Sequence, residues 1–195
     1  MTYTSYGESL LRQYLEIMVP DLERIYNYRP AWLMGLELDI YFPQAKVGVE
    51  FNGDQHYVPT ETFGHPGAQI QRDKEKRRLC GKNDVAMLTV AAIGLEWTKL
   101  NPVRNTIVQR AHDYSGFPER QRMPKDRKSL EYRQWQSMHA KEKNKLRPLN
   151  KLSQEYRKKL IELYDSPTAR IKGKGPAKKA CRKAWQAHEQ RTARI

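Results

Sequence analysis

Two short stretches of alternating apolar and polar residues, joined by a turn, form the clearest pattern along the chain. Residues 36–42 read LELDIYF and residues 47–53 read VGVEFNG, with the turn PQAK between them. Folding the chain at that turn brings the apolar residues together, with Leu38 opposite Phe51, Ile40 opposite Val49 and Phe42 opposite Val47. The alternation therefore predicts an antiparallel β-hairpin over 36–52 with one apolar face.

The other face of this hairpin carries polar residues that suggest chemistry. In the same register Asp39 lies opposite Glu50, and Glu37 lies opposite Asn52. Two carboxylates directly across from each other repel, and a cation bound between them removes that repulsion. Carboxylate oxygens suit a hard ion such as Mg²⁺ (or Mn²⁺), and His56, six residues after Glu50, can move a proton near neutral pH. We interpret this face as a metal-dependent site; the alternative is the solvated polar face that antiparallel hairpins commonly have.

The rest of the first 115 residues contains further helix and strand signals. Ser5 and Glu8 match a capping box, which begins a helix that Pro20 ends, and capping alone also explains Glu8. Downstream the pattern predicts three elements: a helix over 67–80, a buried strand over 85–90 and a helix that Asn101 and Pro102 begin. This order predicts an α/β sandwich with a mixed central sheet.

Beyond residue 116 the chain becomes rich in Lys, Arg and Pro. Its prolines divide it into expected helices near 126–146, 153–164 and 177–192. Aromatic residues are interleaved with the charges, and they either pin these helices together or stack on bases; they are Tyr132, Trp135, Tyr156, Tyr164 and Trp185.

The charge of the chain is unevenly distributed. Residues 1–115 carry 13 Lys and Arg against 14 Asp and Glu, whereas residues 116–195 carry 23 against 8. This division predicts a globular domain over 1–115 and a basic, mainly helical extension over 116–195 that binds a polyanion, above all a nucleic acid. No membrane partner is expected, because no apolar run is long enough to span a bilayer.

The two cysteines give a weak indication of the compartment. Cys80 and Cys181 lie far apart, and neither belongs to a CxxC or Cys/His cluster. This usage favours a reduced, cytoplasmic setting, in a bacterium or a phage-infected cell, and no structural zinc.

Five residues, in order, carry a resemblance to a known group of enzymes. The series Glu8, Asp39, Glu50, His56 and Asp73 is similar to the pattern of very-short-patch-repair-like endonucleases. These include the EDxHD homing endonucleases of the PD-(D/E)xK nuclease superfamily. The resemblance covers roughly residues 5–112 and implies a restriction-endonuclease-like sandwich that hydrolyses DNA with a divalent metal.

The resemblance also implies a role for each matching residue. Asp39 and Glu50 correspond to the metal ligands, and Glu8 to a carboxylate that holds a metal-bound water. His56 corresponds to the general base or acid, and Asp73 to the group that orients it.

The chain departs from the superfamily pattern at one important position. Asn52 stands where the superfamily usually has the lysine that faces the attacking water, and Leu38 replaces the proline before Asp39. Lys74 or Arg77 on the following helix could supply the missing cation, or His56 could act as the base.

The sequence therefore predicts a metal-dependent DNA endonuclease. A nucleic-acid-binding protein that keeps the nuclease fold without catalysis and an RNA-binding protein are the alternatives. The cations expected to contact nucleic acid are Lys74, Arg77, Arg127, Lys128, Arg133, Arg157, Lys158, Lys178, Lys179 and Arg182.

Overall fold

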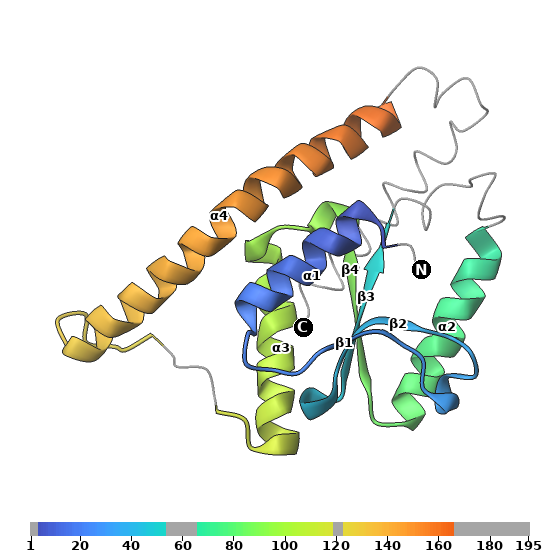
Figure 1. Cartoon of the computed structure of the whole chain (residues 1–195), viewed down its shortest axis with the longest axis horizontal. Coiled ribbons are helices and arrows are strands. Elements are labelled where there is room, and N and C mark those ends of the chain that lie inside the picture. The colour runs from blue at the N-terminus through green and yellow to red at the C-terminus, as the bar shows by residue number, and fades with distance from the viewer. Residues whose placement is uncertain (1–3, 54–65, 119–122, 166–195) are drawn as a thin grey trace.

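The computed structural model describes residues 4–53, 66–118 and 123–165, which form one four-stranded sheet with helices on both faces (Figure 1). The strands are β1 (Ile25–Tyr28), β2 (Leu38–Phe42), β3 (Val47–Asn52) and β4 (Ala86–Ala91). The helices are α1 (Tyr6–Met18), α2 (Pro66–Lys82), α3 (Trp97–Ser115) and α4 (Leu130–Asp165), with 3-10 turns η1 (Ala31–Leu33), η2 (Pro43–Ala45) and η4 (Ala92–Gly94). The strand order is β1-β2-β3-β4, with β4 parallel to β3 and the other neighbours antiparallel. The expected mixed α/β class is confirmed.

The turn end of the hairpin has the expected register. Ile40 pairs with Val49, and Phe42 pairs with Val47. These four side chains are fully buried, as the alternation of apolar residues predicted.

Leu38 departs from the predicted pattern. It belongs to a cluster with residues of α2 and lies against Gly48, on the other side of the sheet from Ile40. The expectation that Leu38 and Ile40 share a face is therefore wrong. The alternation breaks at Asp39, whose carboxylate, rather than a backbone carbonyl, accepts the N–H of Phe51.

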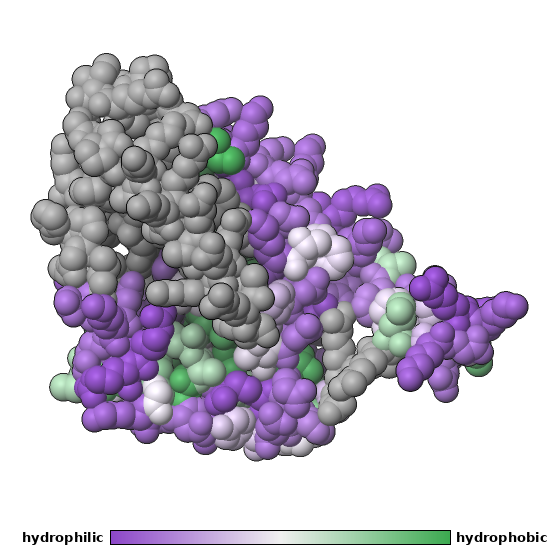
Figure 2. Space-filling view, turned by 180° about the vertical axis from the view of Figure 1, so that it is seen from behind, coloured by the Kyte–Doolittle hydropathy of each residue, from purple (hydrophilic) through white to green (hydrophobic). Residues whose placement is uncertain are grey.

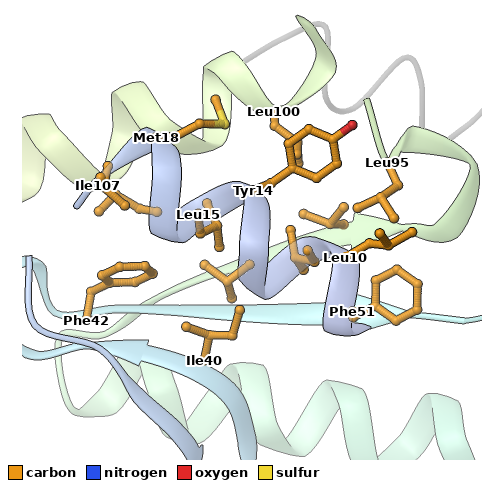
Figure 3. Packing of buried hydrophobic residues seen from close by; sticks show 14 of the residues in the cluster. Leu10, Tyr14, Leu15, Met18, Ile40, Phe42, Phe51, Leu95, Leu100 and Ile107 are labelled. Atoms are coloured by element: carbon orange, nitrogen blue, oxygen red, sulfur yellow. The ribbon is translucent and has the colours of Figure 1, made fainter. Parts of the chain in front are cut away.

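Each face of the sheet buries its own hydrophobic cluster. In the larger cluster, side chains of α1 and α3 point onto β2 and β3 (Figure 3). In the smaller cluster, Leu79 and Cys80 of α2 pack with Leu33 of η1. Because helices cover both faces, the alternative of a solvated polar face does not hold for Glu50, which is only 6% exposed.

Three elements differ from the sequence expectation. Strand β1 was not predicted, because its four residues are all half-buried and give no alternation. Helix α3 begins at Trp97, one turn before Asn101, so Pro102 lies inside it. The helices expected near 126–146 and 153–164 are one helix that continues through Pro148, because buried Leu146 and Leu149 on either side offset the missing hydrogen bond. The helix expected near 177–192 lies outside the described residues.

Helix α4 packs against the first 115 residues. Leu146, Leu149 and Leu160 belong to the same cluster as the side chains of α1. Tyr14 Oη in α1 also donates to Asn150 Oδ1 at 2.7 Å. The described part of the basic extension thus shares the hydrophobic core of the first 115 residues, while the domain boundary at residue 115 stays a prediction.

Gly7 in α1 is required by a close approach between helix and sheet. A Cβ at this position would lie 2.8 Å from Tyr156 Oη and even closer to the ring of Phe51. We expect Gly7→Ala to lower the free energy of unfolding by about 1–3 kcal/mol, because the surrounding core must shift. Urea unfolding measures this loss.

Gly81 in α2 provides the matched control, since a Cβ there meets nothing within 4 Å. Gly81→Ala should be neutral or stabilising by up to about 1 kcal/mol, since alanine restricts the unfolded chain. Equal effects of the two substitutions would contradict the packing argument.

The described surface is mainly hydrophilic. Seen from behind, hydrophobic residues appear only in a few places between charged and polar ones (Figure 2). Among the helices that the structure describes, none has the length and apolar character needed to cross a membrane.

Candidate functional site

Asp39 and Glu50 lie side by side on neighbouring strands. Asp39 Oδ2 in β2 accepts the backbone N–H of Phe51 at 2.7 Å. Glu50 Oε1 in β3 accepts the backbone N–H of Asp39 at 3.3 Å. Each carboxylate is therefore held by the backbone of the opposite strand, and the two remain adjacent despite their like charges.

A lysine from α2 completes this pair. Lys76 Nζ lies 2.5 Å from Glu50 Oε2, and the two residues are 9% and 6% exposed. Lys74 and Arg77, the cations considered from the sequence, are exposed instead. The sequence does hold a signal for Lys76, since it precedes the apolar residues Leu79 and Cys80 by three and four positions and so shares their helix face.

Burial dominates the electrostatics of this cluster. It raises the pKa of Glu50 to about 8, with repulsion from Asp39 as the second cause and Lys76 acting in the opposite direction. Burial also raises the pKa of Asp39, against the Phe51 N–H and the charge of Lys76. The two carboxyl groups therefore hold protons more strongly than exposed acids do.

The raised pKa of Glu50 predicts a pH-dependent stability. The folded protein keeps this proton up to about pH 8, whereas the unfolded chain releases it near the ordinary value of 4.5. Stability should therefore fall as the pH rises from about 4.5 to 8. We expect the free energy of unfolding to fall by roughly 2–5 kcal/mol more in the wild type than in Glu50→Gln, which lacks this titration.

Urea unfolding in EDTA at several pH values across this window measures the difference between the two proteins. Parallel pH curves for the wild type and Glu50→Gln would contradict the raised pKa.

Glu8 in the first turn of α1 lies near this pair. Its backbone N–H donates to Ser5 Oγ at 3.2 Å, and its Oε1 lies 2.5 Å from Arg12 Nη2. Burial and the charge of Asp39 raise the pKa of Glu8, while Arg12 and the backbone of Ser5 lower it. The predicted capping box is confirmed, and it also places a third carboxylate beside Asp39.

Asn27 in β1 links the site to its surroundings, and the sequence analysis missed it. It lies opposite Asp39 in the register that pairs Tyr26 with Ile40, and its φ of 53° is in the left-handed region. Its side chain accepts from Arg12 Nη2 at 2.8 Å and donates to Glu37 Oε1 at 2.9 Å. Asparagine tolerates this backbone conformation better than most residues, which is the only signal the sequence offers.

The structure describes only one of the two remaining predicted site residues. Asp73 is half-buried on α2, on the same helix as Lys76. His56 lies outside the described residues, so its predicted role as base and the pairing with Asp73 stay predictions.

The donor set of the site fits a hard divalent ion. The described residues contain no group of three or more His, Cys, Asp or Glu side chains arranged to hold a metal. Mg²⁺ commonly uses only one or two carboxylates and completes its shell with water and substrate phosphate. Asp39 and Glu50 match that requirement, and Glu8 extends the acidic surroundings.

The predicted nucleic-acid-binding cations fall into three groups. Arg157 Nη1 forms an ion pair with Glu96 Oε2 at 2.8 Å, so this side chain ties α4 to the body. The exposed members are Lys74, Arg77, Arg127, Lys128, Arg133 and Lys158. The members outside the described residues are Lys178, Lys179 and Arg182.

Comparisons with known proteins find two viral relatives. Uncharacterized protein 307L of Invertebrate iridescent virus 6 is 44% identical over 62 residues, which cover 28% of this chain and 30% of that protein. Uncharacterized protein 033L of Invertebrate iridescent virus 3 is 33% identical over 97 residues, which cover 46% of this chain and 50% of that protein. The chain spans at most half the length of these relatives. No protein-family model and no solved structure match the chain.

Proposed function

We propose that this chain is a metal-dependent endonuclease that hydrolyses phosphodiester bonds in DNA on a restriction-endonuclease-like sandwich. The supporting observation is the cluster of the half-buried Asp39 with the buried Glu50 and Lys76, which joins two neighbouring strands and a helix. Burying two like charges together costs stability, and a fold keeps such an arrangement readily when the charges serve a purpose.

In this proposal the cluster divides the chemical work. Asp39 and Glu50 hold Mg²⁺ or Mn²⁺, which when bound polarises the scissile phosphate and lowers the pKa of a bound water. Lys76 takes the position that Asn52 cannot fill, and its ammonium stabilises negative charge that develops on the phosphate. Glu8, held by Arg12, accepts a hydrogen bond from the attacking water.

His56 and Asp73 complete the proposed mechanism on the strength of the sequence pattern. His56 moves the proton of the water or of the leaving oxygen, and Asp73 orients its ring.

A nucleic-acid-binding protein without catalysis is the second candidate. The short contact between Lys76 and Glu50 favours it, because a lysine there neutralises Glu50 without any metal. An RNA-binding role has only the basic composition in its favour.

Nicking of supercoiled plasmid DNA tests the proposal. The purified full chain should convert the plasmid to open circles in Mg²⁺ and not in EDTA, and Asp39→Ala should lose this activity. Tight binding without cleavage of plasmid or of a four-way junction would favour the second candidate. Preference for structured RNA over duplex DNA would favour an RNA-binding role.

A further inference from the structure

One side of α4 carries a line of cations that points away from the core. Its members, which we call the outer row, are exposed: Arg133, Arg147, Lys151 and Lys158. Two exposed carboxylates, Glu155 and Glu162, border its C-terminal half. At about 100° per residue they lie within about 40° of one another around the helix. The buried residues Leu146, Leu149 and Leu160 lie on roughly the opposite side.

The length of the outer row suits a regular polyanion. Because α4 is one unbroken helix from Leu130 to Asp165, the spacing of these cations is set by the helix rise. At about 1.5 Å per residue the row extends over about 38 Å. Each strand of duplex DNA carries one phosphate per about 3.4 Å of the duplex axis, so the row is about as long as one helical turn of the duplex. In Figure 1 the N-terminal end of α4 extends beyond the body.

The contacts of the aromatic side chains of α4 indicate whether the outer row suits a duplex or a single strand. Tyr132 and Trp135 stack with ring centroids 6.1 Å apart, and Trp135 stacks on His139 at 3.8 Å. Tyr156 packs edge-on against Tyr6 of α1 at 5.5 Å. These rings contact each other or the body, and none belongs to the outer row. Single strands are held mainly by bases stacking on aromatic faces, so the outer row suits a phosphate backbone whose bases are paired.

We propose that the outer row of α4 binds the phosphate backbone of duplex DNA and holds the duplex along this helix. The choice of DNA rests on the proposed function. Such contacts position the duplex without reading its sequence.

Salt-dependent binding of the full chain to a duplex of about 24 base pairs, in EDTA, tests this proposal. Arg147→Gln/Lys151→Gln removes two cations of the row. It should reduce the slope of log affinity against log salt by about 1.8 and lower the affinity at 0.1 M salt on the order of 50-fold.

Two further variants make the test specific. Glu162 Oε1 lies 3.9 Å from Lys158 Nζ on the exposed surface, so Glu162→Gln should tighten binding by removing a competing negative charge. Lys82→Gln, in the last turn of α2, removes an exposed cation elsewhere on the molecule and should leave the salt slope unchanged.

The proposal is overturned if the double variant behaves like Lys82→Gln. It is also overturned if the wild type binds the single strand, or the RNA duplex of the same sequence, as tightly as the DNA duplex. The proposed function and the duplex-binding proposal fail in different ways. Binding through the outer row without any cleavage would contradict the endonuclease and leave the duplex-binding proposal intact. Cleavage by the wild type, together with unchanged DNA binding by the double variant, would contradict only the duplex-binding proposal.

Discussion

Lys76→Met is expected to destabilise the fold by about 1 kcal/mol at pH 8.5 and by more at higher pH, because Glu50 without its cation must take up a proton that the wild type has largely lost. Glu50 is 6% exposed and already lies beside Asp39, so neither water nor another described contact replaces the ammonium at 2.5 Å. The free energy of unfolding in urea measures the effect. The buffer should contain EDTA at about pH 8.5, where Glu50, with a pKa of about 8, is largely ionised.

The double variant Lys76→Met/Glu50→Leu should recover most of this loss. Replacing both buried charges with apolar side chains of similar size is often neutral or stabilising. Lys74→Met is the matched control on the same helix, since Lys74 is exposed and its loss should change stability by less than about 0.5 kcal/mol. A double variant as unstable as the single one would show that the ion pair itself stabilises the fold, which weakens the argument for a function.

Asp39→Asn is expected to lower the rate of Mg²⁺-dependent nicking by about 10²–10³-fold, the cost of losing one preorganised charged group. The amide oxygen of asparagine can still accept the Phe51 N–H that Asp39 accepts at 2.7 Å, so the strands should stay in place. The variant loses the negative charge and keeps the shape. Initial rates of plasmid nicking, together with an unchanged circular dichroism spectrum, measure this separation of chemistry from folding.

Asp84→Asn provides the same change of side chain at a site outside the cluster. Asp84 pairs with Lys46 on the exposed surface, and its φ of 56° is tolerated by asparagine. Its nicking rate should equal that of the wild type. An Asp39→Asn protein that cleaves as fast as Asp84→Asn would exclude Asp39 as a metal ligand.

The parts of the fold that were predictable have a strong local pattern. The period-two alternation predicted β2 and β3 and their pairing near the turn, as Ile40 with Val49 shows. The capping box predicted the start of α1, and the helix expected over 67–80 matches α2 to within two residues at its C-terminal end, although Gly81 lies inside α2. Strand β1 was not predicted, because its four residues are each half-buried. Helix α4 was wrongly predicted as two helices, because Pro148 was taken as a helix end despite the apolar residues on either side of it.

The candidate site was predictable only in part for the same reason. Asp39 and Glu50 come together because they lie on adjacent strands of a short hairpin. Lys76 reaches Glu50 from 26 positions further along the chain. Arg12 bonds Asn27, 15 positions away, on an element that the sequence did not predict.

The sequence alone determined the local helices and strands, the uneven distribution of charge and the closeness of Asp39 to Glu50. Each of these depends on residues a few positions apart or across one tight turn. Only the tertiary structure decided three features: the position of Lys76 beside Glu50, the side of the sheet on which Leu38 lies, and the packing of α4 against the core. Tyr14 and Asn150, for example, meet across 136 positions. Such contacts form when buried surfaces of distant elements fit each other, and no local period of apolar and polar residues encodes that fit.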